Sequence, residues 1–151
     1  DELNYMDKKD GDLSFESFKN TNKPNFFGDI EYIYSIFKIK ELPVDLLFKI
    51  LNLVFPDFLI IENHIFFASE FDQDKFNNLR KMEEINRTQF WMNLIEFTSL
   101  HDEMTVEQAL LIAQKIVDSW NAKIKYEGLN AHGRARVFEE VEYGEIFITI
   151  D

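Results

Sequence analysis

Cysteine is absent from this chain of 151 residues, and glycine, proline and histidine are scarce, at five, three and three residues. Without cysteine the chain has no disulfide, no thiolate metal site and no cysteine nucleophile. The glycines do not repeat at the spacing of a phosphate-binding or dinucleotide-binding loop, and the Gly-x-Ser-x-Gly turn that presents a hydrolase serine is missing. These absences exclude several enzyme classes. The lack of cysteine also fits a reducing cytoplasm, which is where we expect the protein to act.

Long uncharged runs are missing as well. No stretch approaches the roughly 20 apolar residues that a membrane-spanning helix needs, and the chain does not open on the pattern of a signal peptide. We therefore expect a soluble protein with no membrane partner.

Basic residues are few relative to acidic ones: 16 lysines and arginines stand against 28 aspartates and glutamates, a formal net charge of -12. Such a surface repels nucleic acid and anionic membranes and favours a basic protein partner. The alternative is that the acidic residues serve solubility alone.

Apolar residues are plentiful, at 46% of the chain, and 16 of them are phenylalanine. The most apolar stretch, residues 42–67, changes its period halfway. Up to Val54 the apolar residues recur at helical spacing, and Pro56 cannot continue a helix. Residues 58–61 and 65–67 then read as two strands joined by a turn in which Asn63 takes a positive φ. This pattern predicts a core helix with Leu51 at its centre, followed by a hairpin.

Further elements follow along the chain. Asp29 and Asp72 are helix caps, residues 83–100 are helical in pattern, and Thr105 with Gln108 forms a capping box that opens a long helix. Alternation in residues 136–141 and 145–150, around Tyr143-Gly144, predicts a second hairpin.

The predicted fold class is α+β, with helices packed on one face of a small antiparallel sheet built from two hairpins. We expect residues 1–28 to be an irregular N-terminal segment, because they are rich in charge and asparagine and contain the Lys23-Pro24 break. Residues 29–151 are then a single α+β domain.

Chemistry-bearing side chains are sparse. The histidines, His64, His101 and His132, do not pair at metal-ligand spacing, and we expect no metal site, no cofactor and no catalytic residues. His101, beside Asp102 and Glu103, is the best candidate for a general base, and it supports an alternative in which the chain is a small enzyme or ligand-binding protein.

The C-terminal hairpin carries an acidic cluster, Glu139, Glu140, Glu142 and Glu145, with no basic residue after Arg136. Like charges that face each other on a hairpin are destabilising, so the cluster indicates a surface that meets a basic partner. Asp102 and Glu103 form a second candidate surface of this kind. The alternative is a charged edge that discourages aggregation between sheets.

The order of several motifs resembles a known group of proteins. Leu42-Pro43, Phe55-Pro56-Asp57-Phe58 with its Asn63-His64 turn, Trp120 with Lys123-Ile124, and a closing Tyr143-Gly144-Glu145-Ile146 strand resemble small bacterial immunity proteins of contact-dependent growth inhibition and polymorphic toxin systems. The resemblance covers residues 29 to 150. It implies a non-enzymatic inhibitor that binds one cognate toxin domain, and a nuclease toxin would offer a basic cleft to an acidic inhibitor. A third reading is an adaptor subunit of a larger assembly.

Overall fold

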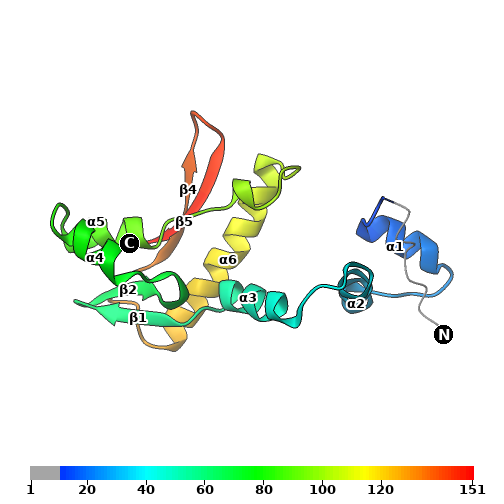
Figure 1. Cartoon of the computed structure of the whole chain (residues 1–151), viewed down its shortest axis with the longest axis horizontal. Coiled ribbons are helices and arrows are strands. Elements are labelled where there is room, and N and C mark those ends of the chain that lie inside the picture. The colour runs from blue at the N-terminus through cyan, green and yellow to red at the C-terminus, as the bar shows by residue number, and fades with distance from the viewer. Residues whose placement is uncertain (1–10) are drawn as a thin grey trace. The chain divides into compact units, whose positions relative to one another are not determined.

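The structure is a computed structural model that describes residues 11–151, and in them it contains six α-helices and five β-strands (Figure 1). The chain divides into two compact units inside helix α3: the first ends at Lys49, and the second covers Ile50–Asp151. The composition of the sequence had placed the boundary after residue 28 instead.

The first unit contains α1 (Phe15–Asn22) and α2 (Asp29–Lys40). Phe18 and Ile39 are buried here, and Tyr32 packs on Phe18 with ring centroids 5.5 Å apart. The expectation of an irregular segment over residues 1–28 is wrong for α1. This helix forms because the Ser14 hydroxyl accepts the backbone N–H of Ser17 at 3.1 Å and caps it. Residues 1–10 of the predicted segment lie outside the described residues.

Helix α3 (Val44–Val54) ends before Pro56, as the sequence predicts. It is not a core helix, however, because none of its residues is buried. Its C-terminal part, from Ile50 on, belongs to the second unit. Within that unit Leu53 packs against the main core, and the indole N–H of Trp120 donates to the Leu53 carbonyl at 2.7 Å. The spacing of apolar residues predicted the helix correctly, but it did not show that the helix is left exposed.

The exposure of Leu51 changes the expected cost of removing its side chain. A core leucine loses about 2–5 kcal/mol of stability on replacement by alanine. Because Leu51 is 56% exposed, Leu51→Ala should instead lower the free energy of unfolding by less than about 1 kcal/mol in a urea titration. Leu53→Ala, two residues along on the side that meets the core, is the matched control and should cost more. Equal losses would contradict the packing described here.

Both predicted hairpins are confirmed. Strand β1 (Phe58–Ile61) pairs with β2 (His64–Phe67) across a two-residue turn, in which Glu62 and Asn63 have φ values of 50° and 62°. Two consecutive positive φ values are what a two-residue hairpin turn matching the strand twist requires. Strand β4 (Ala135–Glu140) pairs with β5 (Glu145–Ile150) around Gly144, whose φ is also positive.

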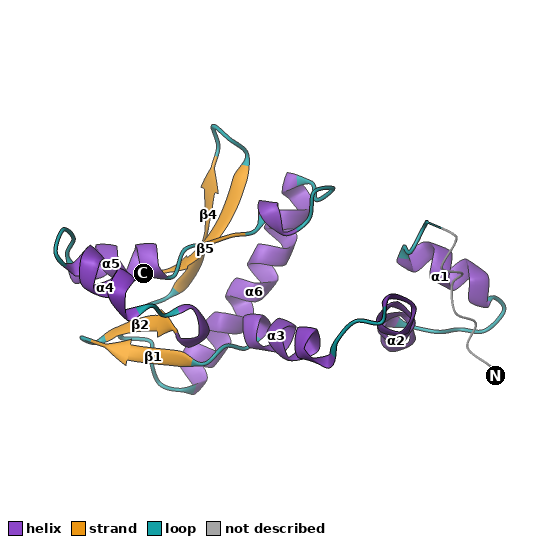
Figure 2. Ribbon diagram, viewed as in Figure 1, coloured by secondary structure: helices purple, strands orange, loops and turns teal. Residues whose placement is uncertain are grey.

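The α+β class is confirmed, but the two hairpins do not join into one sheet (Figure 2). Strands β1 and β2 form a sheet of their own, and a short strand β3 (Ile95–Glu96) joins the second hairpin in the order β3-β5-β4. The outer edge of β2 is occupied by a side chain instead of by a strand of the second hairpin. The Asn93 side chain bonds to the Phe67 N–H and the Ile65 carbonyl at 2.9 and 2.8 Å.

Three helices complete the second unit: α4 (Gln73–Arg80), α5 (Ile85–Met92) and α6 (Val106–Tyr126), with short 3-10 turns at Ala68–Glu70 and Thr98–Leu100. The Thr105 capping box is confirmed at the start of α6, and Asp72 caps α4. The single helix predicted over residues 83–100 is wrong. Helix α5 stops at Met92, because the Asn93 side chain bonds to β2 and residues 95–96 pair with β5.

The main core lies between α6 and one face of the three-stranded sheet. Its fully buried members include Trp120, Phe97, Ile146, Ile148 and Ile150. Helix α5 packs on the opposite face, so helices cover both faces of this sheet rather than the one face predicted. None of the helices in residues 11–151 is long and apolar enough to cross a membrane.

Candidate acidic and aromatic groove

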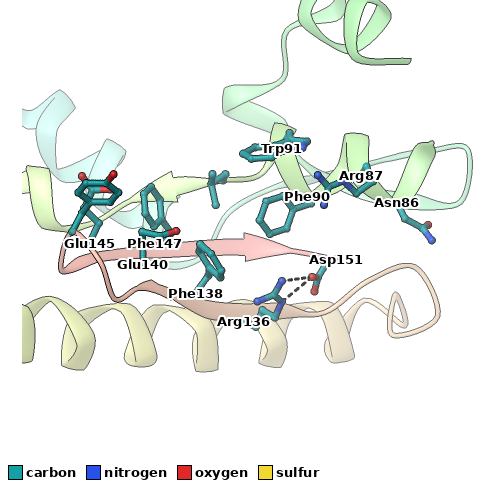
Figure 3. Close-up of a pocket in the computed structure, with 12 residues that line it drawn as sticks. Asn86, Arg87, Phe90, Trp91, Arg136, Phe138, Glu140, Glu145, Phe147 and Asp151 are labelled. Carbon is teal, nitrogen blue, oxygen red and sulfur yellow. Dashed lines mark hydrogen bonds and ion pairs between the residues drawn. The ribbon is translucent and has the colours of Figure 1, made fainter. Parts of the chain in front are cut away.

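An open groove of about 680 Å³ lies between α5 and the face of the β3-β5-β4 sheet that is turned away from α6 (Figure 3). Helix α5 and Leu94, two residues beyond its end, form one wall, and alternate residues of β4 and β5 form the floor. The lining residues are Asn86, Arg87, Phe90, Trp91, Leu94, Arg136, Phe138, Glu140, Tyr143, Glu145, Phe147 and Asp151.

The floor follows from the period of a β-strand, in which successive side chains point to opposite faces. Ala135 and Val137 of β4 point into the core, and the residues that alternate with them, Arg136, Phe138 and Glu140, point into the groove. In the register of the hairpin, Phe138 lies opposite Phe147, and Glu140 lies opposite Glu145. The groove floor therefore has an aromatic pair followed by an acidic pair.

The wall is positioned by one contact and extended by aromatic rings. The Thr149 hydroxyl donates to the Phe90 carbonyl at 2.8 Å and ties α5 to β5. The Phe90 ring meets the edge of Trp91 at a centroid distance of 5.0 Å and that of Phe138 at 6.1 Å. Aromatic faces from both sides thus line the groove, and they offer stacking and cation–π contacts to a ligand.

Arginine side chains lie at one end of the groove, and their charges are already engaged. The Arg136 guanidinium forms an ion pair with Asp151 at 2.7 Å, drawn as dashed lines in Figure 3, and stacks over Phe90 at 5.6 Å. Arg87 lies 5.6 Å from the Trp91 ring centroid and 3.8 Å from a Glu83 oxygen. This end is therefore close to neutral.

The other end carries Glu140 and Glu145, which are half-buried. Neither carboxylate makes an ion pair with any residue between 11 and 151, although Glu62, Glu127 and Asp151 do. Two like charges directly opposite each other on an antiparallel pair destabilise it. The groove thus combines an aromatic floor with two carboxylates that the chain itself leaves without a cationic partner.

The other acidic residues predicted from the sequence lie elsewhere. Glu139 is exposed on the α6 side of β4, because it alternates with the groove residues, and Glu142 is exposed in the hairpin turn. Asp102 and Glu103 are exposed in the loop before α6 and do not line the groove. The structure therefore brings together only Glu140 and Glu145.

His101 and Glu103 line a second, shallower pocket of about 500 Å³, together with Met104, Gln108, Leu111 and Ile112. The Nδ1 atom of His101 accepts the backbone N–H of Glu103 at 3.2 Å. No carboxylate oxygen of residues 11–151 bonds to this imidazole, so the orientation that a general base needs is not fixed by an acid. Within the same residues, no group of three or more histidine, aspartate or glutamate side chains is placed to hold a metal ion.

Sequence reasoning missed the aromatic part of the groove. The helical pattern of residues 83–100 gives no sign that Phe90 and Trp91 line a groove, whereas Trp91 is 40% exposed. A signal for the floor was present, because any hairpin with Glu140 opposite Glu145 must place Phe138 and Phe147 on the same face. The arrival of α5 over that face depends on long-range packing and has no local signal.

We compared the chain with protein-family models, with curated proteins and with solved structures, and none of the three comparisons gave a match. The groove and the charges around it are therefore the features from which a function can be inferred.

Proposed function

We propose that this protein is a non-enzymatic binding protein that acts in the cytoplasm and neutralises a basic protein partner, as an immunity protein neutralises its cognate toxin domain. The observation that carries the proposal is the groove in which Glu140 and Glu145 face each other without a cationic partner among the described residues. A lysine or arginine of the partner would relieve their repulsion and stack on the neighbouring aromatic rings.

The net charge of the whole chain also supports binding to a basic partner. A net charge of -12 attracts a basic surface over a range set by the Debye length, which falls from about 10 Å at 0.1 M salt to about 3 Å at 1 M. Association with a basic toxin domain should therefore be fast at low salt and slower at high salt.

The test uses the toxin domain encoded beside this gene and a double charge reversal, Glu140→Lys with Glu145→Lys. Because both side chains line the groove, the reversal replaces two attractions by two repulsions. It should weaken binding about 10–100-fold, chiefly through faster dissociation, in surface plasmon resonance. In cells that express the toxin domain, the wild-type protein should restore growth and the variant should not.

The matched control is Asp102→Lys with Glu103→Lys, which changes the net charge equally but lies outside the groove. It should slow association and leave dissociation unchanged. Circular dichroism checks that both variants fold. Full affinity in the groove variant would refute the proposal for this surface, and a loss confined to the control variant would move the binding surface to the loop before α6.

A second candidate function, a small enzyme or ligand-binding protein, is supported by the pocket that His101 shares with Glu103. An activity that is lost in His101→Ala, with an unchanged circular dichroism spectrum, would establish this function in place of the first.

A further inference from the structure

The hydrogen-bond register of the second hairpin shows which backbone groups of β4 point outward. Arg134 and Asp151 exchange both backbone hydrogen bonds, at 2.9 and 3.2 Å. Bonded and non-bonded pairs alternate in an antiparallel ladder, so Arg136, Phe138 and Glu140 bond to β5. The N–H and C=O groups of Ala135, Val137 and Glu139 therefore point away from β5, toward the open edge of the sheet.

The neighbouring strand confirms this alternation. The Phe97 N–H donates to the Ile146 carbonyl at 2.7 Å. The backbone N–H and C=O groups of the even-numbered residues of β5 therefore point toward β3, and those of the odd-numbered residues point toward β4. Strand β5 is consequently paired on both sides, and β4 is an edge strand.

At Ala135, the first residue of this edge, the outward backbone groups are already bonded to a side chain. Asn121 of α6 donates to the Ala135 carbonyl and accepts the Ala135 N–H, both at 2.9 Å, which are the two bonds that a paired strand would make. Val137 and Glu139, in contrast, have no hydrogen-bond partner for their outward groups among residues 11–151. The open part of the edge is therefore limited to these two residues.

The fold closes the edge of β2 more fully. The Ile65 N–H donates to the His132 carbonyl, and the Asn93 side chain bonds to the Ile65 carbonyl and the Phe67 N–H. The outward backbone groups of β1, at Phe58 and Ile60, also have no hydrogen-bond partner in the described part of the chain, but neither residue is acidic. The β4 edge differs because it adjoins Glu139 and Glu140 and the groove.

Resting on the proposed function, we propose that the basic partner binds by adding a strand antiparallel to β4, with its backbone paired to Val137 and Glu139. Side chains directly opposite each other on paired strands interact most strongly. From its N-terminal to its C-terminal end, the added strand passes Glu140, Glu139, Phe138 and Val137 in turn. The segment recognised is thus two basic residues followed by two apolar ones, and its first basic side chain lies on the groove face beside Glu140 and Glu145.

The probe is an acetylated, amidated hexapeptide, threonine-lysine-lysine-valine-isoleucine-threonine, titrated into the whole chain and followed by two-dimensional NMR. At saturation of the shift changes, hydrogen exchange at the Val137 and Glu139 amides should slow, because both gain an acceptor. Exchange at Phe138 should change little, because its N–H is already bonded to β5. The peptide with the reversed residue order is the matched control, and it should bind more weakly since it places its apolar residues opposite the acids.

Two variants separate backbone pairing from charge. Glu139→Pro removes one outward N–H without removing a bond between β4 and β5, since proline is tolerated at such edge positions. Glu139→Gln removes the same charge and keeps the N–H. Peptide binding should be lost in the proline variant and only weakened in the glutamine variant, with the NMR spectrum of each confirming the fold.

Unchanged exchange at Val137 and Glu139, equal binding of the two peptide orders, or no shift at any peptide concentration would each overturn strand addition. None of these results would refute the proposed function, because the groove reversal is judged against the toxin domain itself. Loss of toxin binding in that reversal together with unprotected Val137 and Glu139 amides would leave a partner that meets the groove by side chains alone.

Discussion

Trp120→Ala should lower the free energy of unfolding of the second unit by about 3–5 kcal/mol, the cost of deleting a large aromatic side chain from a core. Trp120 is fully buried. Its ring centroid lies 5.2 Å from that of Phe67 and 6.5 Å from that of Phe58. Its indole N–H is bonded to the Leu53 carbonyl at 2.7 Å. The substitution therefore leaves a cavity where α3, α6 and the first hairpin meet, and an acceptor without its donor.

The chain provides its own control, because its second tryptophan lies in the groove. Trp91 is 40% exposed, and Trp91→Ala should cost less than about 1 kcal/mol. Urea titrations followed by circular dichroism measure both variants independently of tryptophan fluorescence. If the two substitutions cost the same, the assignment of Trp120 to the core and of Trp91 to the groove would be wrong.

Asn93→Ala should cost about 2–4 kcal/mol, although it removes only a small side chain. The Asn93 amide is the partner of the buried Phe67 N–H, at 2.9 Å, and donates to the Ile65 carbonyl at 2.8 Å. A buried backbone group left without a partner costs about 1–3 kcal/mol. Gln89 also reaches the Ile65 carbonyl, at 3.3 Å, so the Phe67 N–H should account for most of the loss.

Asn86→Ala, in the first turn of the helix that Asn93 follows, is the corresponding control. Asn86 is exposed, and its side chain bonds to the His64 ring at 2.6 Å on the surface, so its removal should change stability by less than about 1 kcal/mol. Amide exchange of Phe67 gives a second readout, since it should accelerate only in the Asn93 variant. An unchanged Phe67 exchange rate would show that another group can replace the asparagine.

Local signals in the sequence predicted the elements that depend on a few adjacent residues. Pro56 fixed the end of α3, Asn63 and Gly144 fixed the two turns, and Thr105 with Gln108 fixed the start of α6. Each signal works through backbone geometry or a cap, and neither needs a distant partner.

Apart from helix α1, which begins at a local Ser14 cap, the elements that were predicted wrongly depend on distant partners. Met92 ends α5 because Asn93 bonds to β2, which lies 26 residues earlier in the chain. The same side chain occupies the outer edge of β2, whose sheet is separate from that of the second hairpin. The spacing of apolar residues likewise could not show that Leu51 is exposed. It identifies the apolar side of a helix, but it does not identify the element that packs against that side.

The candidate site was only partly predicted, because it too depends on how distant residues pack. The charge pattern identified Glu140 and Glu145, but alternation in the hairpin also separates them from Glu139, which the charge pattern alone does not reveal. Asn121 and Asn93 bond to strand edges, and the sequence gives no sign of these roles. A role played by a single polar residue does not produce a repeating pattern along the chain.

The central position of β5 has a consequence for how this protein is made. Strand β5 lies between β3 and β4, yet it is the last of the described strands to leave the ribosome. Synthesis proceeds from the N-terminal end, so β3 and β4 remain without their common neighbour until residue 150 has been added. The three-stranded sheet must therefore assemble after translation has passed Ile150, and a transcript truncated before Glu145 would yield a chain with neither the middle strand nor half of the acidic pair.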